Sequence, residues 1–112
     1  MTQLKTFYAD APHGVTIDLT EAEPCWLLNR IHTNRFRGER GKGYAAALIK
    51  IVLADADADG ISLMLSVEPH PGVDYNRLRN WYVRLGFRQF SPDDHSTLIR
   101  TPERTINHDQ PR

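Results

Sequence analysis

Arg40-Gly41-Lys42-Gly43-Tyr44-Ala45 separates an apolar run at residues 26–31 from the most strongly helical segment of the chain, residues 44–58. The two glycines that flank the lysine leave backbone N–H groups unshielded. The start of the following helix adds unpaired N–H donors and a partial positive charge. Corners of this kind bind phosphate, so the segment predicts a ligand that carries phosphate groups.

Two common phosphate-binding patterns fit this segment poorly. A P-loop requires Gly-x4-Gly-Lys-Ser/Thr, but Gly38 lies only three residues before Gly41, and a glycine follows Lys42. The dinucleotide fingerprint fits loosely over residues 41–46, yet Glu68 lies beyond the usual spacing of about 20 residues for its acidic partner. Too little chain follows for the repeated strand–helix units that a dinucleotide-binding fold needs.

A third pattern, Gln/Arg-x-x-Gly-x-Gly/Ala, is satisfied at every fixed position by Arg40-Gly41-Lys42-Gly43-Tyr44-Ala45. This match resembles the coenzyme A loop of the GNAT superfamily of acetyl-CoA-dependent N-acetyltransferases. Tyr82-Val83-Arg84-Leu85-Gly86-Phe87 is similar to the Tyr-x-x-x-Gly-Phe motif of the same family. The two motifs occur in the family's order and spacing, and the resemblance covers roughly residues 25–100.

The patterning predicts one α/β domain, residues 1–101, with elements in the order β-β-β-α-β-α-β-β and a polar tail at 102–112. A strand, a helix and a strand across residues 25–67 require a right-handed parallel crossover. We expect a mixed, twisted sheet, with one helix on one face and the second helix near the other. The expected strands are 3–8, 15–19, 25–33, 61–67, 87–90 and 96–101, and the expected helices are 44–58 and 75–85.

Two local expectations concern the middle of the chain. Alternation along residues 25–33 places Trp26 and Leu28 on one face and Cys25, Leu27 and Ile31 on the other, which indicates a central strand. The acidic residues 55, 57 and 59 crowd the C-terminal end of the first helix, where the helix dipole disfavours negative charge. We therefore expect its last turn to fray.

Composition narrows the class of protein. The chain has 112 residues, of which 40% are hydrophobic and 25% charged, as in ordinary globular domains. Its 14 basic and 14 acidic side chains cancel, so the overall charge gives no reason to expect nucleic acid as the main partner. Without an apolar leader or a membrane-spanning run, the protein is expected in the cytoplasm. The single cysteine, Cys25, excludes an internal disulfide and a cysteine-rich metal site.

The resemblance implies roles for particular residues. The backbone N–H groups of residues 41–45 would hold the pyrophosphate of acetyl-CoA, and Arg40 and Lys42 would add positive charge. The backbone of Ile31, His32 and Thr33 would line the pantetheine arm. Tyr82 would protonate the leaving thiolate, because a phenol remains protonated at neutral pH.

The base that accepts the proton of the incoming amine is left open by the spacing. Glu68, at the end of a predicted strand, is the first choice, and His32, His70 and Asp74 are the alternatives. His13 and His95 fall in predicted turns, and no pair of histidines has the spacing of metal ligands, so no metal is expected.

The resemblance implies transfer of an acetyl group from acetyl-CoA to an amine. One alternative is a protein-interaction module that retains the acetyltransferase fold. Another is a nucleic-acid binder that uses the basic residues 30–42, which zero net charge disfavours. Members of the family that the chain resembles usually begin with a strand and two helices that cover the acceptor side, whereas only 24 residues precede the central strand here. The resemblance therefore implies that the acceptor side is open. Either a bulky acceptor, such as a protein amine, or a second subunit in a homodimer would then complete the site.

Overall fold

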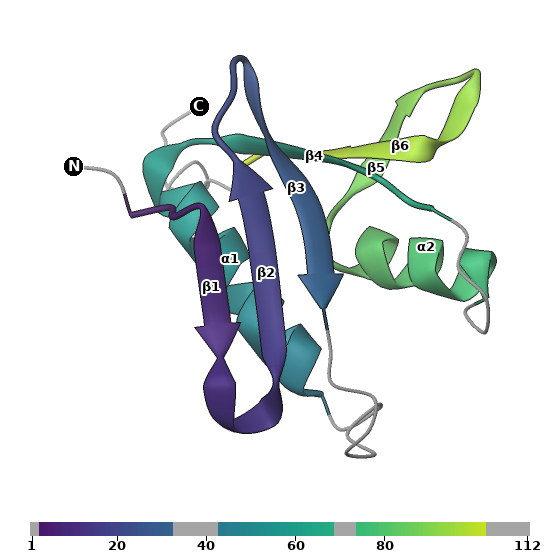
Figure 1. The fold of residues 1–112 in the computed structure, drawn as a ribbon. Helices are drawn as coiled ribbons and strands as arrows, with labels where there is room; N and C mark the ends of the chain where they lie inside the picture. Colours follow the sequence, from purple (N-terminus) through teal and green to yellow (C-terminus); the bar gives the residue numbers. More distant parts are fainter. Residues whose placement is uncertain (1–2, 33–42, 69–73, 103–112) are drawn as a thin grey trace, which may run out of the picture.

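The computed structural model describes residues 3–32, 43–68 and 74–102 (Figure 1). Its elements follow the expected order, with one short 3-10 helix, η1, added after the first strand. The tail lies almost wholly outside the described residues. The strands are β1 (Phe7–Asp10), β2 (Val15–Thr20), β3 (Cys25–His32), β4 (Ser62–Ser66), β5 (Arg88–Ser91) and β6 (Asp94–Arg100), and the helices are η1 (Ala11–His13), α1 (Tyr44–Asp59) and α2 (Tyr75–Arg84).

The six strands form one mixed sheet in the order β1-β2-β3-β4-β6-β5. β3 and β4 pair in parallel, and every other neighbouring pair is antiparallel. β3 therefore lies inside the sheet, as expected for a central strand. The closing hairpin is tighter than expected, because β5 and β6 extend until residues 92 and 93 alone form the turn.

Glycines lie at both ends of α1, and a side-chain cap stabilises the start of α2. Gly43 and Gly60 lie at the two ends of α1 with φ of 85° and 70°, in the left-handed region that glycine adopts without strain. Asp74 accepts hydrogen bonds from the N–H groups of Asn76 and Arg77, which confirms it as the N-cap of α2. The buried stripe of α1 consists of Leu48, Ile49, Val52, Leu53 and Ala56.

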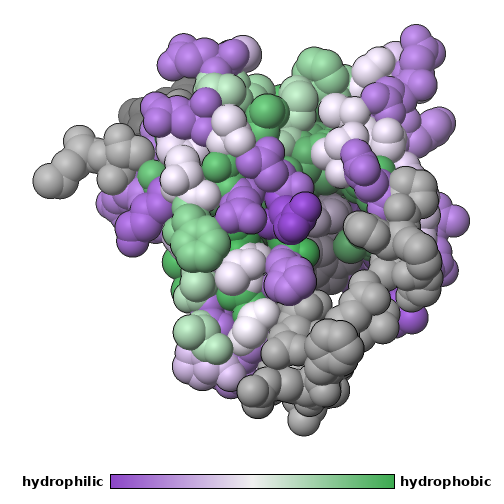
Figure 2. Space-filling model, in the orientation of Figure 1, coloured by the Kyte–Doolittle hydropathy of each residue, from purple (hydrophilic) through white to green (hydrophobic). Residues whose placement is uncertain are grey.

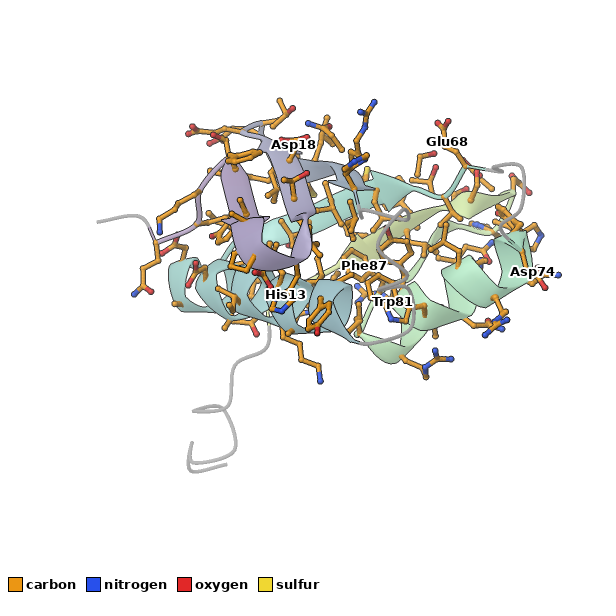
Figure 3. The ribbon with its side chains drawn as sticks, turned by 60° about the horizontal axis from the view of Figure 1, so that its bottom comes forward. His13, Asp18, Glu68, Asp74, Trp81 and Phe87 are labelled. Atoms are coloured by element: carbon orange, nitrogen blue, oxygen red, sulfur yellow. The ribbon has the colours of Figure 1, made fainter. Side chains whose placement is uncertain are left out.

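Both helices pack against the same face of the sheet, so the expectation of one helix on each face is wrong. Figure 3 shows α1 and α2 below the sheet, while Asp18 and Glu68 point away from them above it. The physical reason is that Leu63, Leu65 and Leu98 all project from one face into a single core that also contains the α1 stripe and Tyr82. Among the described residues, no helix covers the opposite face, which we call the bare face.

A β-bulge changes the alternation of β3. Asp18 pairs with Arg30, whereas the next residue, Leu19, pairs with Leu28, so Asn29 is an extra residue in β3. Ile31 consequently pairs with the buried Ile17 and packs against the core on the side of the helices. The expectation that Ile31 would share a face with Leu27 is wrong for this reason.

The last turn of α1 is not frayed, because two of its carboxylates bind N-terminal segments and the third binds β6. Asp55 accepts a hydrogen bond of 2.7 Å from the Tyr8 hydroxyl, and Asp59 accepts bonds from the N–H groups of Gln3 and Leu4. Asp57 forms an ion pair with Arg100. These contacts outweigh the unfavourable helix dipole and extend α1 to Asp59.

None of the helices in the described residues has the length and apolar character that crossing a membrane requires.

Candidate functional site

The sheet opens between β3 and β4, and we call this opening the parting. The two strands pair over Cys25–Leu27 and Ser62–Met64, and no pairing between them continues beyond those residues. β3 nevertheless runs on to His32 and β4 to Ser66, and Figure 1 shows the two strands diverging. The bulge at Asn29 lies where the parting begins. The facing edges of the two strands therefore present backbone groups that no described neighbouring strand pairs.

The start of α1 lies at the same end of the molecule as the end of β3 (Figure 1). Gly43 offers no side chain to cap the helix, and the first turn contains no acidic residue. A Cβ atom built on Gly43 would meet no described atom within 4 Å. The first N–H groups of the helix form a partially positive terminus, which is what an anion site requires, and no side chain among the described residues caps it. Tyr44 and Ala45, the other described members of the predicted loop, are partly buried against the core.

Four of the predicted cofactor-binding residues, Thr33, Arg40, Gly41 and Lys42, lie outside the described residues, and their roles stay predictions. Ile31 is partly buried beside the core, and His32 is exposed at the end of β3. Both lie on the strand that borders the parting. The described part of the predicted loop and the predicted pantetheine segment therefore border one region of the molecule.

Tyr82 lies in the core, in the last turn of α2, with 9% of its surface exposed. Its ring makes edge contacts with Trp81 and with Phe87, whose ring centroid is 5.6 Å away. Burial raises the pKa of Tyr82 to about 12, because the anionic phenolate would lose its hydration. The hydroxyl therefore remains a proton donor throughout the physiological pH range. No hydrogen bond joins that hydroxyl to another residue within the described ranges.

Glu68 and Tyr82 are not brought together. Val67 is buried on the helix side of the sheet, whereas the next residue, Glu68, is exposed and points away from the helices (Figure 3). The carboxylate and the phenol thus lie on opposite sides of the sheet, one accessible to solvent and one enclosed. Of the alternative bases, Asp74 is engaged as the N-cap of α2, and His70 lies outside the described residues.

One cluster beside the start of α1 was missed at the level of sequence. His13, in η1, lies with its Nδ1 atom 2.8 Å from an oxygen of Asp10. Its ring stacks on the ring of Tyr44, with 3.6 Å between the centroids and 17° between the planes. No motif or spacing relates residue 13 to residue 44, so only the folded hairpin reveals the contact. In the part of the chain that is described, no group of three or more acidic, histidine or cysteine side chains could hold a metal ion.

Comparison of the sequence with protein-family models finds no match, and comparison with curated proteins finds none either. Solved structures do match in fold. The anti-CRISPR protein AcrVA5 superposes with a TM-score of 0.67 at 18% identity, over 83% of this chain and 94% of that one. A GNAT-family acetyltransferase from Staphylococcus aureus Mu50 gives 0.60 at 17% identity, and the structure of AtaTR bound with AcCoA gives 0.51 at 21% identity.

The chain has the GNAT fold. This confirms the expected fold class. The GNAT-family acetyltransferase is covered over 60% of its length by 80% of this chain, and AtaTR over 55% by 78%. The match to AcrVA5 spans nearly all of that protein, so the GNAT fold also occurs at about the size of the domain described above.

Proposed function

We propose that this protein transfers an acetyl group from acetyl-CoA to an amine. The observation that carries the proposal is the parting of β3 and β4 at the end of the sheet where α1 begins without a cap. A GNAT-fold structure bound with AcCoA supports the choice of ligand. The parting suits an extended arm that hydrogen-bonds to strand edges, and the helix terminus suits the pyrophosphate at the end of that arm.

Within this proposal, the N–H groups that follow Gly43 bind the pyrophosphate, together with the predicted residues 40–42. The pantetheine arm lies along residues 31–33 of β3 and its continuation. The amine nitrogen attacks the thioester carbonyl carbon, a C–N bond forms, and the C–S bond breaks. The amine loses a proton to Glu68, or to solvent through it, and the sulfur leaves as a thiolate.

Tyr82 acts on the leaving sulfur. The pKa of a thiol is about 8.5, so a phenol with a pKa of about 12 holds its proton more tightly than the departing sulfur would. Most of its contribution therefore comes from a hydrogen bond donated to the negative charge that develops on sulfur. The thiolate therefore leaves hydrogen-bonded to the phenol, which keeps its proton, and any proton that the sulfur gains after release comes from solvent.

The acceptor approaches from the bare face in this proposal, since Glu68 points to that side. This face shows hydrophobic groups broken up by hydrophilic ones (Figure 2). Leu27 and Phe7, which lie on it, are 39% and 54% exposed. A small amine finds few contacts on such an open surface, because small-molecule sites normally enclose their ligands. A protein lysine or N-terminal amine, or a site completed by a second subunit, fits this geometry better.

The direct test is thioester cleavage with a panel of acceptors. Purified protein, freed of bound CoA, is given acetyl-CoA and either small amines, lysine-containing peptides or an intact protein mixture. We expect CoA release that depends on the larger acceptors and is accompanied by acetylated lysine or N-termini in mass spectra. Efficient acetylation of a free small amine by a monomer would contradict the bulky acceptor. Failure of acetyl-CoA to bind in calorimetry would remove the transferase proposal.

A second candidate is a protein-interaction module with the GNAT fold, and the exposed apolar residues of the bare face favour it. Leu27, Met64 and Ile99 are register neighbours across three adjacent strands and form a continuous apolar row. Contiguous apolar surface is often a contact for another protein. This candidate predicts no thioester cleavage with any acceptor, and Leu27→Glu would abolish partner binding while acetyl-CoA affinity stays unchanged.

A further inference from the structure

Three side chains from β1, η1 and α1 meet beside the start of α1. Asp10 ends β1, His13 ends η1, and Tyr44 is the first residue of α1. The hydrogen bond between Asp10 and His13 and the stacking of His13 on Tyr44 form a continuous chain of contacts, which we call the His13 clamp. Figure 3 shows His13 on the helix side of the sheet, below the β1–β2 hairpin.

The local sequence explains why His13 turns toward Asp10. Pro12 lies in the first turn of η1, and Gly14 follows it with φ of 69°, closing the turn with a hydrogen bond from its N–H to the carbonyl oxygen of Ala11. This single tight turn places residues 10 and 13 side by side. Because Nδ1 lies within hydrogen-bond distance of a carboxylate, it carries a proton and its partner fixes the orientation of the ring.

The clamp contacts Tyr44, whose position determines the orientation of the first turn of α1. Tyr44 directly follows Gly43, whose backbone is free of side-chain restraint, and the first helical hydrogen bond runs from the N–H of Ala47 to the carbonyl of Gly43. A ring contact with a centroid separation of 3.6 Å limits how far Tyr44 can rotate or shift. The direction of the N–H groups in the first turn of α1 is thereby tied to the β1–β2 hairpin.

We propose that the His13 clamp pre-orients the start of α1 for the pyrophosphate of acetyl-CoA, with His13 as a positioning residue. The inference rests on the proposed function and adds to it which residues determine affinity for the phosphorylated end of the donor. Hydrogen bonds to phosphate oxygens depend strongly on distance and angle, and an ordered donor set loses less entropy on binding. The clamp affects binding of the donor and leaves the acetyl-transfer step unchanged.

The test compares acetyl-CoA with S-acetylpantetheine, which has the same thioester arm without the phosphates. We expect His13→Ala to weaken acetyl-CoA binding about tenfold, or about 1.4 kcal/mol, and to leave S-acetylpantetheine binding unchanged. The KM for acetyl-CoA should rise by the same factor while kcat at saturation is retained. His13→Phe, which retains a ring over Tyr44, should recover most of the affinity. His95→Ala, at an exposed histidine in the closing hairpin, is the control and should change the binding of neither ligand.

A double-mutant cycle separates the clamp from a general loss of stability. If the clamp acts through Tyr44, Tyr44→Leu should weaken acetyl-CoA binding, and adding His13→Ala should have little further effect. Fully additive losses, or equal weakening of both ligands by His13→Ala, would overturn the inference while the proposed function stands. If His13→Ala does not fold, the wild type is compared with His13→Phe and with Asp10→Ala. Of these two variants, only Asp10→Ala should lose affinity for acetyl-CoA, and it should keep its affinity for S-acetylpantetheine. A wild-type protein that does not bind acetyl-CoA would remove both proposals.

Discussion

Arg100 and Asp57 are joined at two points: Nη1 of the arginine lies 2.8 Å from Oδ1 of the aspartate, and Nη2 lies 3.1 Å from Oδ2. The Arg100 Nε–H also donates to the carbonyl oxygen of Leu85, just beyond the end of α2. One largely buried side chain on β6 thus binds the C-terminal ends of both helices. This arrangement holds α1 and α2 on the same face of the sheet.

Replacing Arg100 should therefore destabilise the whole domain. We expect Arg100→Met to lower the free energy of unfolding by about 3–5 kcal/mol, because a partly buried carboxylate loses its guanidinium partner. Arg100→Lys should lose less, since it keeps the charge but cannot form the two-point contact. Urea denaturation measures both, and Arg88→Met, at an exposed arginine of β5, is the control. A loss below 1 kcal/mol in Arg100→Met would show that the ion pair contributes little.

Substitution of Gly43 should abolish acetyl-CoA binding. Gly43→Val places a side chain at the start of α1, where the phosphate must approach, and also strains a backbone with φ of 85°. Gly60→Val separates the two effects, because Gly60 has φ of 70° and lies at the other end of the same helix, where an added Cβ atom would likewise meet no described atom within 4 Å. Both variants should lose similar stability in thermal melts. In calorimetry only Gly43→Val should lose affinity, and unchanged affinity in a folded Gly43→Val would refute the pyrophosphate site.

Removing the hydroxyl of Tyr82 should slow the chemical step. Tyr82→Phe retains the ring contacts with Trp81 and Phe87 but deletes the only proton donor that the side chain offers. We expect kcat to fall by roughly 10²-fold with little change in acetyl-CoA affinity. Tyr75→Phe, at the first position of the same helix, is the matched control. A fall of less than threefold in Tyr82→Phe would reduce this tyrosine to a packing role.

Alkaline pH should reveal the burial of Tyr82. Below about pH 10 the folded and unfolded chains both retain the phenolic proton, so pH has no effect on stability through this group. Between about 10 and 12 the unfolded chain releases the proton while the folded chain keeps it, since its pKa is about 12. Stability should fall there by about 1.4 kcal/mol per pH unit on account of Tyr82. Tyr82→Phe should remove this contribution in denaturation series, and an unchanged slope would show that the hydroxyl is accessible to water.

Local signals were enough to predict most of the fold. Gly43 and Gly60 mark the ends of α1, Asp74 marks the start of α2, and the two sequence motifs pointed to the GNAT fold. These features depend on residues close together in the chain, where spacing and propensity are informative. The boundaries of the interior strands were predicted to within about two residues for the same reason.

Apart from the length of the closing hairpin, the errors involve contacts between distant segments. The bulge at Asn29 arises from pairing with β2, and it reverses the face of Ile31 without any mark in the sequence of β3. The carboxylates of α1 looked unfavourable because their partners, including Tyr8 and Arg100, lie more than 40 residues away. His13 appeared to be an ordinary turn residue until folding placed it on Tyr44. Long-range pairing of this kind leaves no periodic pattern from which it could be predicted.

Three residue pairs between β3 and β4 join the half-sheet β1-β2-β3 to the half-sheet β4-β6-β5 in the described part of the chain. A ligand lying in the parting would bridge the halves and bind the folded chain alone. By mass action, a free ligand concentration 100 times Kd would add about 2.7 kcal/mol to the free energy of unfolding. Since proteases act on the opened population, the supply of the ligand would set how long each copy of the protein survives in the cell.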